Sequence, residues 1–291
     1  MTTIAIVTCT ELGGIGVESR YPWPRLYFEE DNFASRVGDN IVLVGSGAFL
    51  GHKHLRGSTT YVLTNNTEFE TSDTVKIISG TPEEVIAKVA EIVDQLDSDK
   101  DTPIGICFPA IIKDGVTLSA ANVSKDWVGV KAEKFFSKAL NRKVVLLNDA
   151  DAAGVAEIKY GAGQERKGLV LMVTLGTGIG TALFWNGKLI PNSELGHLQI
   201  DGVDYESMAS FSAKEREGLS FADWAKRLTK YFNMVDRLLS PDLIIVGGGV
   251  SKQHEEFLPL IETKIKIVPA ESKNNAGIIG AAFIARRRLK P

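Results

Sequence analysis

The sequence predicts an α/β fold with about two domains. Short runs of β-branched and apolar residues alternate with segments of helical periodicity, which is typical of α/β chains. Residues 168–190 add a Gly-rich segment that predicts paired strands. A length of 291 residues fits two domains of roughly 150 residues each and allows a buried core without disulfide or metal staples. A small secreted scaffold is therefore excluded.

Several short apolar runs are expected to form the strands. Each run is rich in β-branched residues and is bounded by turn-forming or polar residues. The runs are 4–9, 40–45, 59–64, 74–79, 103–108, 143–148 and 242–247.

A first helix is expected directly after Gly80. Thr81 can cap this helix, Pro82 suits its first position and Glu84 completes a capping box. The helix should end in the polar stretch 97–101. Its apolar face comprises Val85, Val89, Ile92, Val93 and Leu96.

A second helix is expected to stop at Ser240-Pro241. Its apolar positions are Leu219, Trp224, Leu228, Tyr231, Val235 and Leu238. Between the two helices, residues 168–190 predict two strands joined by a Gly-rich turn, with a further turn at Asn186-Gly187. The basic run 286–288 is expected to be a solvated helix end, which the helix dipole favours.

Composition and charge exclude further classes of protein. Hydrophobic residues make up 44% and charged residues 24%, close to the soluble average, which excludes wholesale disorder and fibrous repeats. The 33 basic and 36 acidic residues give a net charge of −3. A protein whose whole surface binds nucleic acid or anionic lipid would be basic. We therefore expect neither nucleic acid nor a membrane as partner, although a local basic groove is compatible with this charge.

The cysteines and the N-terminal residues predict a cytoplasmic protein. Cys9 and Cys107 are far apart and lack the paired spacing of a zinc or redox motif. The first ten residues contain no basic region followed by a long apolar core, and the sequence holds no run of about 18 apolar residues.

Asn148 and Asp149 form the first candidate site, at the end of an apolar run and before a small-residue helix. Ligands collect at the carboxyl ends of strands in open α/β sheets. A carboxylate there can take a proton from a substrate hydroxyl that attacks phosphorus, while the amide orients other hydroxyls. An Asx turn that caps the helix is the alternative, and these residues alone favour neither reading.

Two Gly-rich segments are candidate phosphate sites. Glycines add no Cβ between the backbone and a ligand, so consecutive N–H groups of residues 175–180 can approach phosphate oxygens. The segment 247–251, directly after a strand, repeats this arrangement. Gly-rich hairpin turns are common, so ordinary turns are the alternative at both places.

The segment Asn192 to His197 places a carboxylate, an imidazole and an amide within six residues. Such groups can bind several hydroxyls of a polyol at once through neutral or charge-assisted hydrogen bonds. A lone histidine is more often structural, and no cysteine cluster follows it, so we expect no metal at His197.

From about Thr81 to Leu289 the sequence resembles the polyphosphate glucokinases of the ROK family of sugar kinases. The matching segments occur in the family's order; they are 120–130, 147–163, 174–202, 215–228, 241–260 and 274–282. The resemblance implies an actin-like (ribonuclease H-like), two-lobed kinase that moves a phosphoryl group from polyphosphate or ATP to the 6-hydroxyl of glucose. It also implies Mg²⁺ as cofactor and a homodimer. Many relatives carry a zinc-binding cysteine cluster where this chain has residues 203–210, so no zinc is expected.

The resemblance also implies residue roles. Asp149 would be the catalytic base. The sugar would be held by Asn122, Asn148, Glu194, His197 and Glu206. The donor phosphates or nucleotide would be bordered by Gly13, Gly14, Gly176, Thr177, Gly178, Gly247, Gly248 and Gly249.

Residues 1–80 depart from this pattern. The family's first phosphate loop has a hydroxyl residue and a lysine where this chain has Ile15 and Glu18, although Gly13 and Gly14 remain. A carboxylate facing phosphate is repulsive unless a metal intervenes, so activity would be reduced. Residues 13–33 instead resemble the start of a dihydrofolate reductase, in which Glu29 would be the pterin-binding acid, with Trp23 and Phe33 beside it.

The domain prediction follows from both resemblances. An N-terminal lobe, 1–125, would combine a reductase-like segment, 1–80, with a kinase-like segment, 81–125, and a C-terminal sugar kinase lobe would span 126–291. The junction near Gly80 suggests a chimera. A sugar kinase is thus the first hypothesis, a chimeric or degenerate protein that binds glucose with little phosphotransfer is the second, and an NADPH-dependent dihydrofolate reductase is the third.

Overall fold

The computed structural model describes residues 3–9, 41–43, 62–64, 74–76, 80–95, 103–120, 123–272 and 276–289. The candidate residues Gly13, Gly14 and Asn122, and the loop with Ile15 and Glu18, lie outside the described residues. The reductase-like positions Trp23, Glu29 and Phe33 lie outside them as well.

The chain forms two compact units, residues 1–149 with 278–291, and residues 150–277. These units divide the chain after residues 149 and 277. The boundary between lobes that we expect at residue 125 stays a prediction.

The first unit contains a mixed sheet, in the order β4-β3-β1-β5-β8, with β2 also paired to β1. Strand β1 pairs antiparallel with β5, and β5 pairs parallel with β8. The strands of the first unit are β1 (Thr3–Cys9), β2 (Ile41–Leu43), β3 (Val62–Thr64), β4 (Thr74–Lys76), β5 (Ile104–Phe108), β6 (Ile112–Lys113), β7 (Val116–Thr117) and β8 (Val144–Asn148). Among the described strands, β6 and β7 pair only with each other. The helices of this unit are α2 (Pro82–Gln95), η1 (Lys125–Trp127), α3 (Ala132–Leu140) and most of α9 (Ala276–Leu289).

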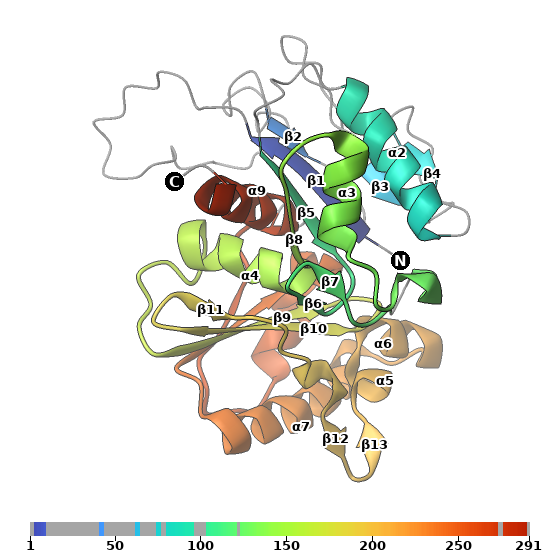
Figure 1. The fold of residues 1–291 in the computed structure, drawn as a ribbon. Coiled ribbons are helices and arrows are strands. Elements are labelled where there is room, and N and C mark those ends of the chain that lie inside the picture. Colours follow the sequence, from blue (N-terminus) through green and yellow to red (C-terminus); the bar gives the residue numbers. More distant parts are fainter. Residues whose placement is uncertain are drawn as a thin grey trace. The chain divides into compact units, whose positions relative to one another are not determined.

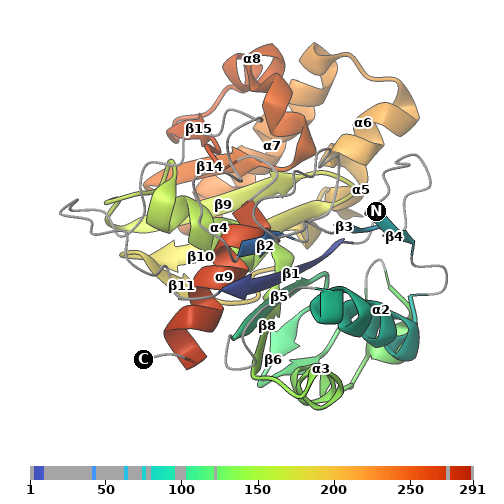
Figure 2. The same ribbon diagram turned by 90° about the horizontal axis from the view of Figure 1, so that it is seen from above.

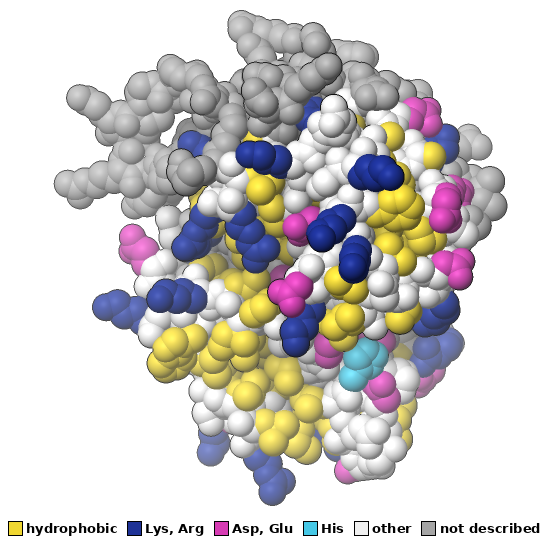
Figure 3. Space-filling model, in the orientation of Figure 1, with side chains coloured by type: hydrophobic (Ala, Val, Ile, Leu, Met, Phe, Trp, Pro, Cys, Tyr) yellow, Lys and Arg dark blue, Asp and Glu magenta, His cyan; other side chains and the backbone are white. Residues whose placement is uncertain are grey.

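Alternation along β5 explains how helices cover this sheet. Ile104, Ile106 and Phe108 face the apolar core formed with α2 and α3. Gly105 faces the other way, and a Cβ there would lie 2.3 Å from the carbonyl oxygen of Ala281 on α9. The helices therefore lie on opposite faces, α2 and α3 on one and α9 on the other (Figure 2). Basic side chains lie at several places on the surface drawn in Figure 3, including the region of α3. Lys131, directly before α3, and Lys134 and Lys138 on this helix are exposed.

The second unit contains a sheet in the order β11-β10-β9-β14-β15 (Figure 1). The strands of the second unit are β9 (Leu169–Leu175), β10 (Ile179–Trp185), β11 (Lys188–Ile190), β12 (Gln199–Ile200), β13 (Val203–Asp204), β14 (Leu243–Gly247) and β15 (Ile267–Pro269). Of the strands that the structure describes, β12 and β13 pair only with each other. The helices of this unit are α4 (Asp149–Tyr160), η2 (Leu195–His197), α5 (Glu206–Ala209), α6 (Phe211–Glu217), α7 (Phe221–Leu239), η3 (Gly249–Gln253), α8 (His254–Phe257) and η4 (Leu258–Leu260).

Helices α7 and α4 cover opposite faces of this sheet (Figure 1). Helix α7 buries Trp224, Leu228 and Tyr231 in a core with alternate residues of β9 and β14. Helix α4 packs closely on β10, because a Cβ at Gly154 would lie 2.6 Å from the Phe184 ring.

Within the described residues, the structure confirms a strand in each predicted run and both predicted helices, with a few local differences. Leu96, the side chain of Ile92 and the predicted end of the first helix at 97–101 lie outside the described residues. Glu84 accepts a hydrogen bond from the N–H of Gly80 at 2.8 Å, so the side chain reaches one residue before the cap Thr81. Leu219 precedes the N-cap Ser220 of α7 and packs on the core outside the helix. Leu238 was expected on the apolar face of α7 but is 56% exposed, because the periodicity extends one turn beyond the buried stripe. The described helices include none long and apolar enough to cross a membrane.

Candidate active site

Asn148 and Asp149 lie at the predicted end of a strand. Strand β8 ends at Asn148, and α4 begins at Asp149. Both side chains are half-buried. The Asn148 amide donates to the carbonyl oxygen of Ala110 at 3.2 Å, which fixes its orientation at the end of the parallel pair β5 and β8. The carboxylate and the amide thus stand at a strand end, as ligand-binding groups do in open sheets.

The first Gly-rich segment is the turn between β9 and β10. Within this turn, the N–H of Gly176 donates to the carbonyl oxygen of Gly178 at 3.0 Å. Ser212, at the start of α6, donates its N–H to Gly176 at 3.1 Å and its hydroxyl to the carbonyl oxygen of Thr177 at 2.5 Å. The expectation that consecutive N–H groups are open to phosphate therefore fails for Gly176 in this conformation, because its N–H is used inside the turn. Thr177 itself is exposed.

The second Gly-rich segment lies beside the first. Strands β14 and β9 are parallel neighbours, and Gly247 pairs with Thr174. Gly248 has a φ of +87° and lies against Leu175, where a Cβ would come within 2.3 Å of the Leu175 carbonyl oxygen. Only glycine meets both conditions without strain. The two segments expected to border donor phosphates are thus neighbours at one edge of the sheet.

Glu194, His197 and Glu206 form an interacting cluster in the second unit. Burial raises the pKa of Glu194, the positive charge of His197 opposes this rise, and the Glu206 carboxylate adds to it. A hydrogen bond from His197 Nδ1 to Asp204 Oδ2, 2.8 Å long, raises the pKa of His197, and nearby Glu206 also raises it. These carboxylates and the imidazole offer acceptors and a donor to a polyhydroxylated ligand.

Glu206 joins this cluster to the glycine turn. Its Oε2 accepts a hydrogen bond from the N–H of Ile179 at 2.8 Å, one residue after the turn. A Cβ at Gly178 would lie 2.4 Å from the same oxygen, so glycine allows the approach. The structure therefore brings together three predicted sugar ligands and the predicted donor turn.

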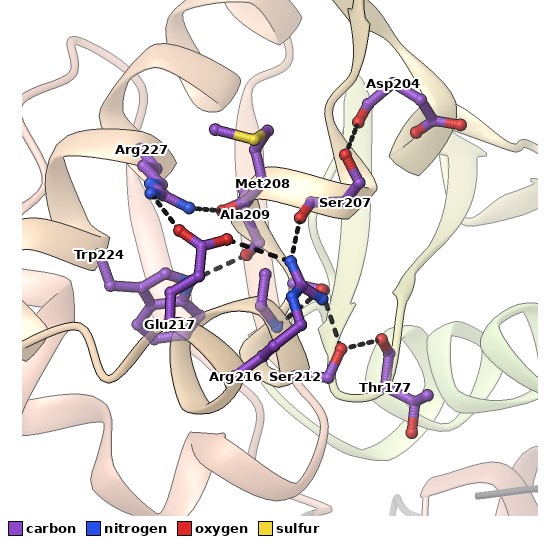
Figure 4. A network of polar contacts seen from close by, with 12 residues as sticks. Thr177, Asp204, Ser207, Met208, Ala209, Ser212, Arg216, Glu217, Trp224 and Arg227 are labelled. Atoms are coloured by element: carbon purple, nitrogen blue, oxygen red, sulfur yellow. Dashed lines mark hydrogen bonds and ion pairs between the residues drawn. The ribbon is translucent and has the colours of Figure 1, made fainter.

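A polar network supports the short helices that carry Glu206 and Ser212 (Figure 4). The last carbonyl groups of α5 are capped from α6 and α7. Arg216 donates to Ser207, Arg227 to Met208 and the Trp224 indole to Ala209, at 2.8, 2.9 and 2.9 Å. Arg227 also pairs with Glu217 at 2.6 Å. These bonds hold α5 against α6 and α7, and the bonds from Ser212 join α6 to the glycine turn.

Two buried polar residues near the cluster are not predicted from the sequence. Asp151 on α4 is 1% exposed, and its Oδ2 accepts the N–H of Asn192 at 2.9 Å. Thr181 on β10 is 2% exposed, and its hydroxyl donates to the carbonyl oxygen of Ser193 at 2.7 Å. The sequence gives no indication that these residues lie near Glu194. The only related feature is that Asp151 is a second carboxylate shortly after Asp149.

The described part of the chain holds no group of three or more His, Cys, Asp or Glu side chains arranged to bind a metal. Mg²⁺ in phosphoryl-transfer sites is bound through one or two carboxylates together with substrate phosphates and waters. The half-buried carboxylate of Asp149 is an oxygen donor of this kind.

Comparisons with known proteins identify relatives. The sequence profile of the ROK family matches residues 56–218. A polyphosphate glucokinase of Mycobacterium leprae is 42% identical over 215 residues, covering 72% of this chain and 66% of that protein, just under two thirds of its length. A polyphosphate glucokinase of Mycobacterium tuberculosis is 41% identical, covering 72% of this chain and 80% of that protein.

A solved structure extends the likeness to the fold. The inorganic polyphosphate/ATP-glucomannokinase of Arthrobacter sp. strain KM is 48% identical, with a TM-score of 0.69, covering 72% of this chain and 85% of that one. The predicted actin-like, two-lobed α/β fold is confirmed by this likeness.

The comparisons do not support the reductase-like segment. The family match begins at residue 56, upstream of the junction expected near Gly80. The short strands β3 and β4 therefore lie in the matched part of the chain, together with the glycine turn, the sugar cluster and Asp149. The chain belongs to the ROK family.

Proposed function

We propose that this protein is a sugar kinase that transfers a phosphoryl group from polyphosphate or ATP to the 6-hydroxyl of glucose. The observation that carries the proposal is the hydrogen bond from Ile179 to Glu206, since it joins a cluster suited to hydroxyl groups to a glycine turn suited to phosphate. The relatives named polyphosphate glucokinase and polyphosphate/ATP-glucomannokinase support the choice of substrates.

The sugar is held by side chains that bind several hydroxyls at once. Glu194, Glu206 and His197 supply charged acceptors and an imidazole from one side of the second unit. Asn148 supplies an amide whose orientation is set by Ala110, and Asn122 completes the set. Hydrogen bonds to charged groups are stronger than neutral ones and confer orientation as well as affinity.

Asp149 acts as the catalytic base. Its carboxylate takes the proton of the 6-hydroxyl as that oxygen forms a bond to the terminal phosphorus of the donor. The bond from this phosphorus to the bridging oxygen breaks, and the leaving group is ADP or the shortened polyphosphate. Positioning of the reactants and stabilisation of charge supply most of the acceleration in such reactions.

The donor phosphates lie along the two Gly-rich segments. The backbone of Thr177 and Gly178, and that of residues 247–249, faces them without intervening side chains. The family resemblance also assigns Gly13 and Gly14, which lie outside the described residues, to the donor phosphates. Mg²⁺ would be held by Asp149 and the phosphates, and it would supply neutralisation of the developing charge.

The decisive experiment measures glucose 6-phosphate formed from glucose, Mg²⁺ and either ATP or polyphosphate. We expect the wild-type protein to form product. The rate should be at least a hundredfold lower in Asp149→Asn, because general base catalysis contributes about 10²–10⁴-fold to a reaction rate. Asp114→Asn is the matched control, because Asp114 is an exposed turn residue with a φ of +52° that asparagine tolerates.

The alternatives are separated in the same experiment. Glucose binding without turnover in either protein would establish the degenerate, sugar-binding form expected from Ile15 and Glu18. Oxidation of NADPH with dihydrofolate would establish the reductase, which no observation favours. The homodimer, the cytoplasmic location and the absence of nucleic acid and membrane partners belong to this proposal too, and light scattering tests the dimer against the 31.6 kDa of one chain.

A further inference from the structure

Resting on this proposed function, we propose that Asp151 and Thr181 are positioning residues for glucose, because they fix the backbone on both sides of Glu194. Neither is expected to touch the sugar. Their role is to hold the segment 192–196 so that the Glu194 carboxylate meets glucose in one orientation.

Asp151 holds the start of the segment. Its side chain is 1% exposed, and its Oδ2 accepts the N–H of Asn192 at 2.9 Å. Asn192 has a φ of +60°, a left-handed conformation that asparagine tolerates better than most residues, and the hydrogen bond from outside the turn supports it there. A buried carboxylate that accepts a backbone N–H provides such support, because a charge-assisted hydrogen bond is stronger than a neutral one.

Thr181 holds the middle of the segment. Its buried hydroxyl donates to the carbonyl oxygen of Ser193 at 2.7 Å and accepts the N–H of Leu195 at 3.0 Å. These two bonds fall directly before and directly after Glu194. The Ser193 hydroxyl also donates to Thr181 at 3.0 Å, so one side chain makes three bonds to the segment.

Close packing brings the two supports to the same place. A Cβ at Gly180 would lie 3.0 Å from Ala150 on α4, and a Cβ at Gly154 would lie 2.9 Å from Ala182 on β10. Small residues therefore let α4 approach β10 closely enough for both to reach the segment. At its end, Gly196 lies against β10, where a Cβ would come within 2.0 Å of the Ile179 carbonyl oxygen.

The arrangement predicts a selective effect on glucose. Thr181→Val keeps the shape of the side chain but leaves the Ser193 carbonyl and the Leu195 N–H without this partner. We expect KM and Kd for glucose to rise about tenfold, because the Glu194 carboxylate would no longer be held in one orientation. KM for ATP should stay within about twofold. Thr181→Ser keeps the hydroxyl and should restore glucose affinity.

Three further variants complete the test. Asp151→Asn keeps an oxygen acceptor for Asn192 and should raise KM for glucose less than Asp151→Ala does. Thr229→Val is the matched control, because Thr229 on α7 accepts the N–H of Glu262 at 3.0 Å far along the chain from this segment. This control should leave both KM values unchanged. Hydrogen exchange of the Leu195 amide should accelerate in Thr181→Val and not in Thr229→Val.

The outcomes are distinguishable. Equal loss for glucose and ATP in Thr181→Val, or no loss for glucose, would overturn the positioning role while leaving the kinase intact. A wild-type protein that neither binds nor phosphorylates glucose would overturn the proposed function and the positioning role together.

Discussion

At the scale of single residues, the sugar cluster separates two ionisable groups by environment. Desolvation is the main cause that raises the pKa of Glu194, whereas the pKa of His197 rises mainly through the hydrogen bond to Asp204. Burial and Glu206 disfavour the negative form of Glu194 and His197 favours it, whereas the carboxylates around His197 favour its positive form. Both pKa values are therefore raised, that of Glu194 mainly by desolvation and that of His197 mainly by a hydrogen bond.

The His197–Asp204 pair predicts a measurable titration. Asp204→Asn removes the first cause of the raised pKa of His197, so this pKa should fall toward 6.5, the ordinary value. Because the folded-state pKa is raised, the pair stabilises the protein fully below about pH 6.5 and loses this contribution as pH rises through the folded-state value. NMR titration of the imidazole protons measures the shift, and an unchanged titration in Asp204→Asn would contradict the assignment.

Gly178 predicts a steric effect at the turn. In Gly178→Ala the new Cβ would lie 2.4 Å from Glu206 Oε2, so the carboxylate must move and lose the Ile179 N–H. We expect a loss of about 1–3 kcal/mol in the free energy of unfolding, the cost of an unsatisfied buried group. Chemical denaturation measures this loss.

Gly176→Ala is the steric comparison for this substitution. A Cβ at Gly176 meets nothing within 4 Å, so the free energy of unfolding should stay within about 0.5 kcal/mol of wild type. Equal losses in the two variants would show that space around the turn does not distinguish them.

At the scale of elements, α4 carries three acidic side chains that lie in different places and have different roles. Asp149 opens the helix at the end of β8, and Asp151 reaches the segment before Glu194. Glu157, two turns later, is fully buried and accepts three backbone N–H groups. It accepts Ala162 at 2.9 Å, Glu271 at 3.1 Å and Ser272 at 2.7 Å. A helix built from small residues can place these carboxylates close to its neighbours.

Glu157 predicts a large effect on stability. In Glu157→Gln one carboxylate oxygen becomes an NH₂ group, which must face an N–H donor instead of accepting from it. We expect the free energy of unfolding to fall by about 2–4 kcal/mol, since a buried donor is left unpaired and a charge-assisted bond is lost. Urea denaturation measures it. Glu165→Gln, an exposed position, is the control, and similar stability of the two variants would contradict the buried network.

At the scale of the whole molecule, the chain crosses between its two compact units near residues 149 and 277. Asp149 thus lies at the end of the first unit and directly precedes the second. Ligand binding to the folded protein stabilises it by mass action, whichever unit supplies the contacts. Stability in the presence of ligand is therefore a readout of binding that does not require turnover.

Glucose should raise the temperature of unfolding. At a concentration of 100 Kd the stabilisation is about 2.7 kcal/mol, which corresponds to several degrees. Asp149→Asn should keep this shift while losing activity, because the carboxylate acts in proton transfer. Glu194→Gln should lose much of the shift, because it removes a charged sugar ligand. Differential scanning fluorimetry with and without glucose measures these effects, and a wild type insensitive to glucose would count against the proposed sugar site.

Local patterns in the sequence determined the elements and the candidate groups. The capping signal before α2, the hairpin at 168–190 and the strand end at Asn148 depend on neighbouring residues, and so periodicity and turn chemistry are sufficient to predict them. The tertiary structure alone decided that the Gly176 N–H is used within its turn and that Leu238 is exposed. It also decided that Asp151 holds Asn192, 41 positions away, and that Glu157 holds Ser272, 115 positions away. The physical reason is that a hydrogen bond requires two groups within about 3 Å, and only the packing of α4 on its sheet brings these groups so close.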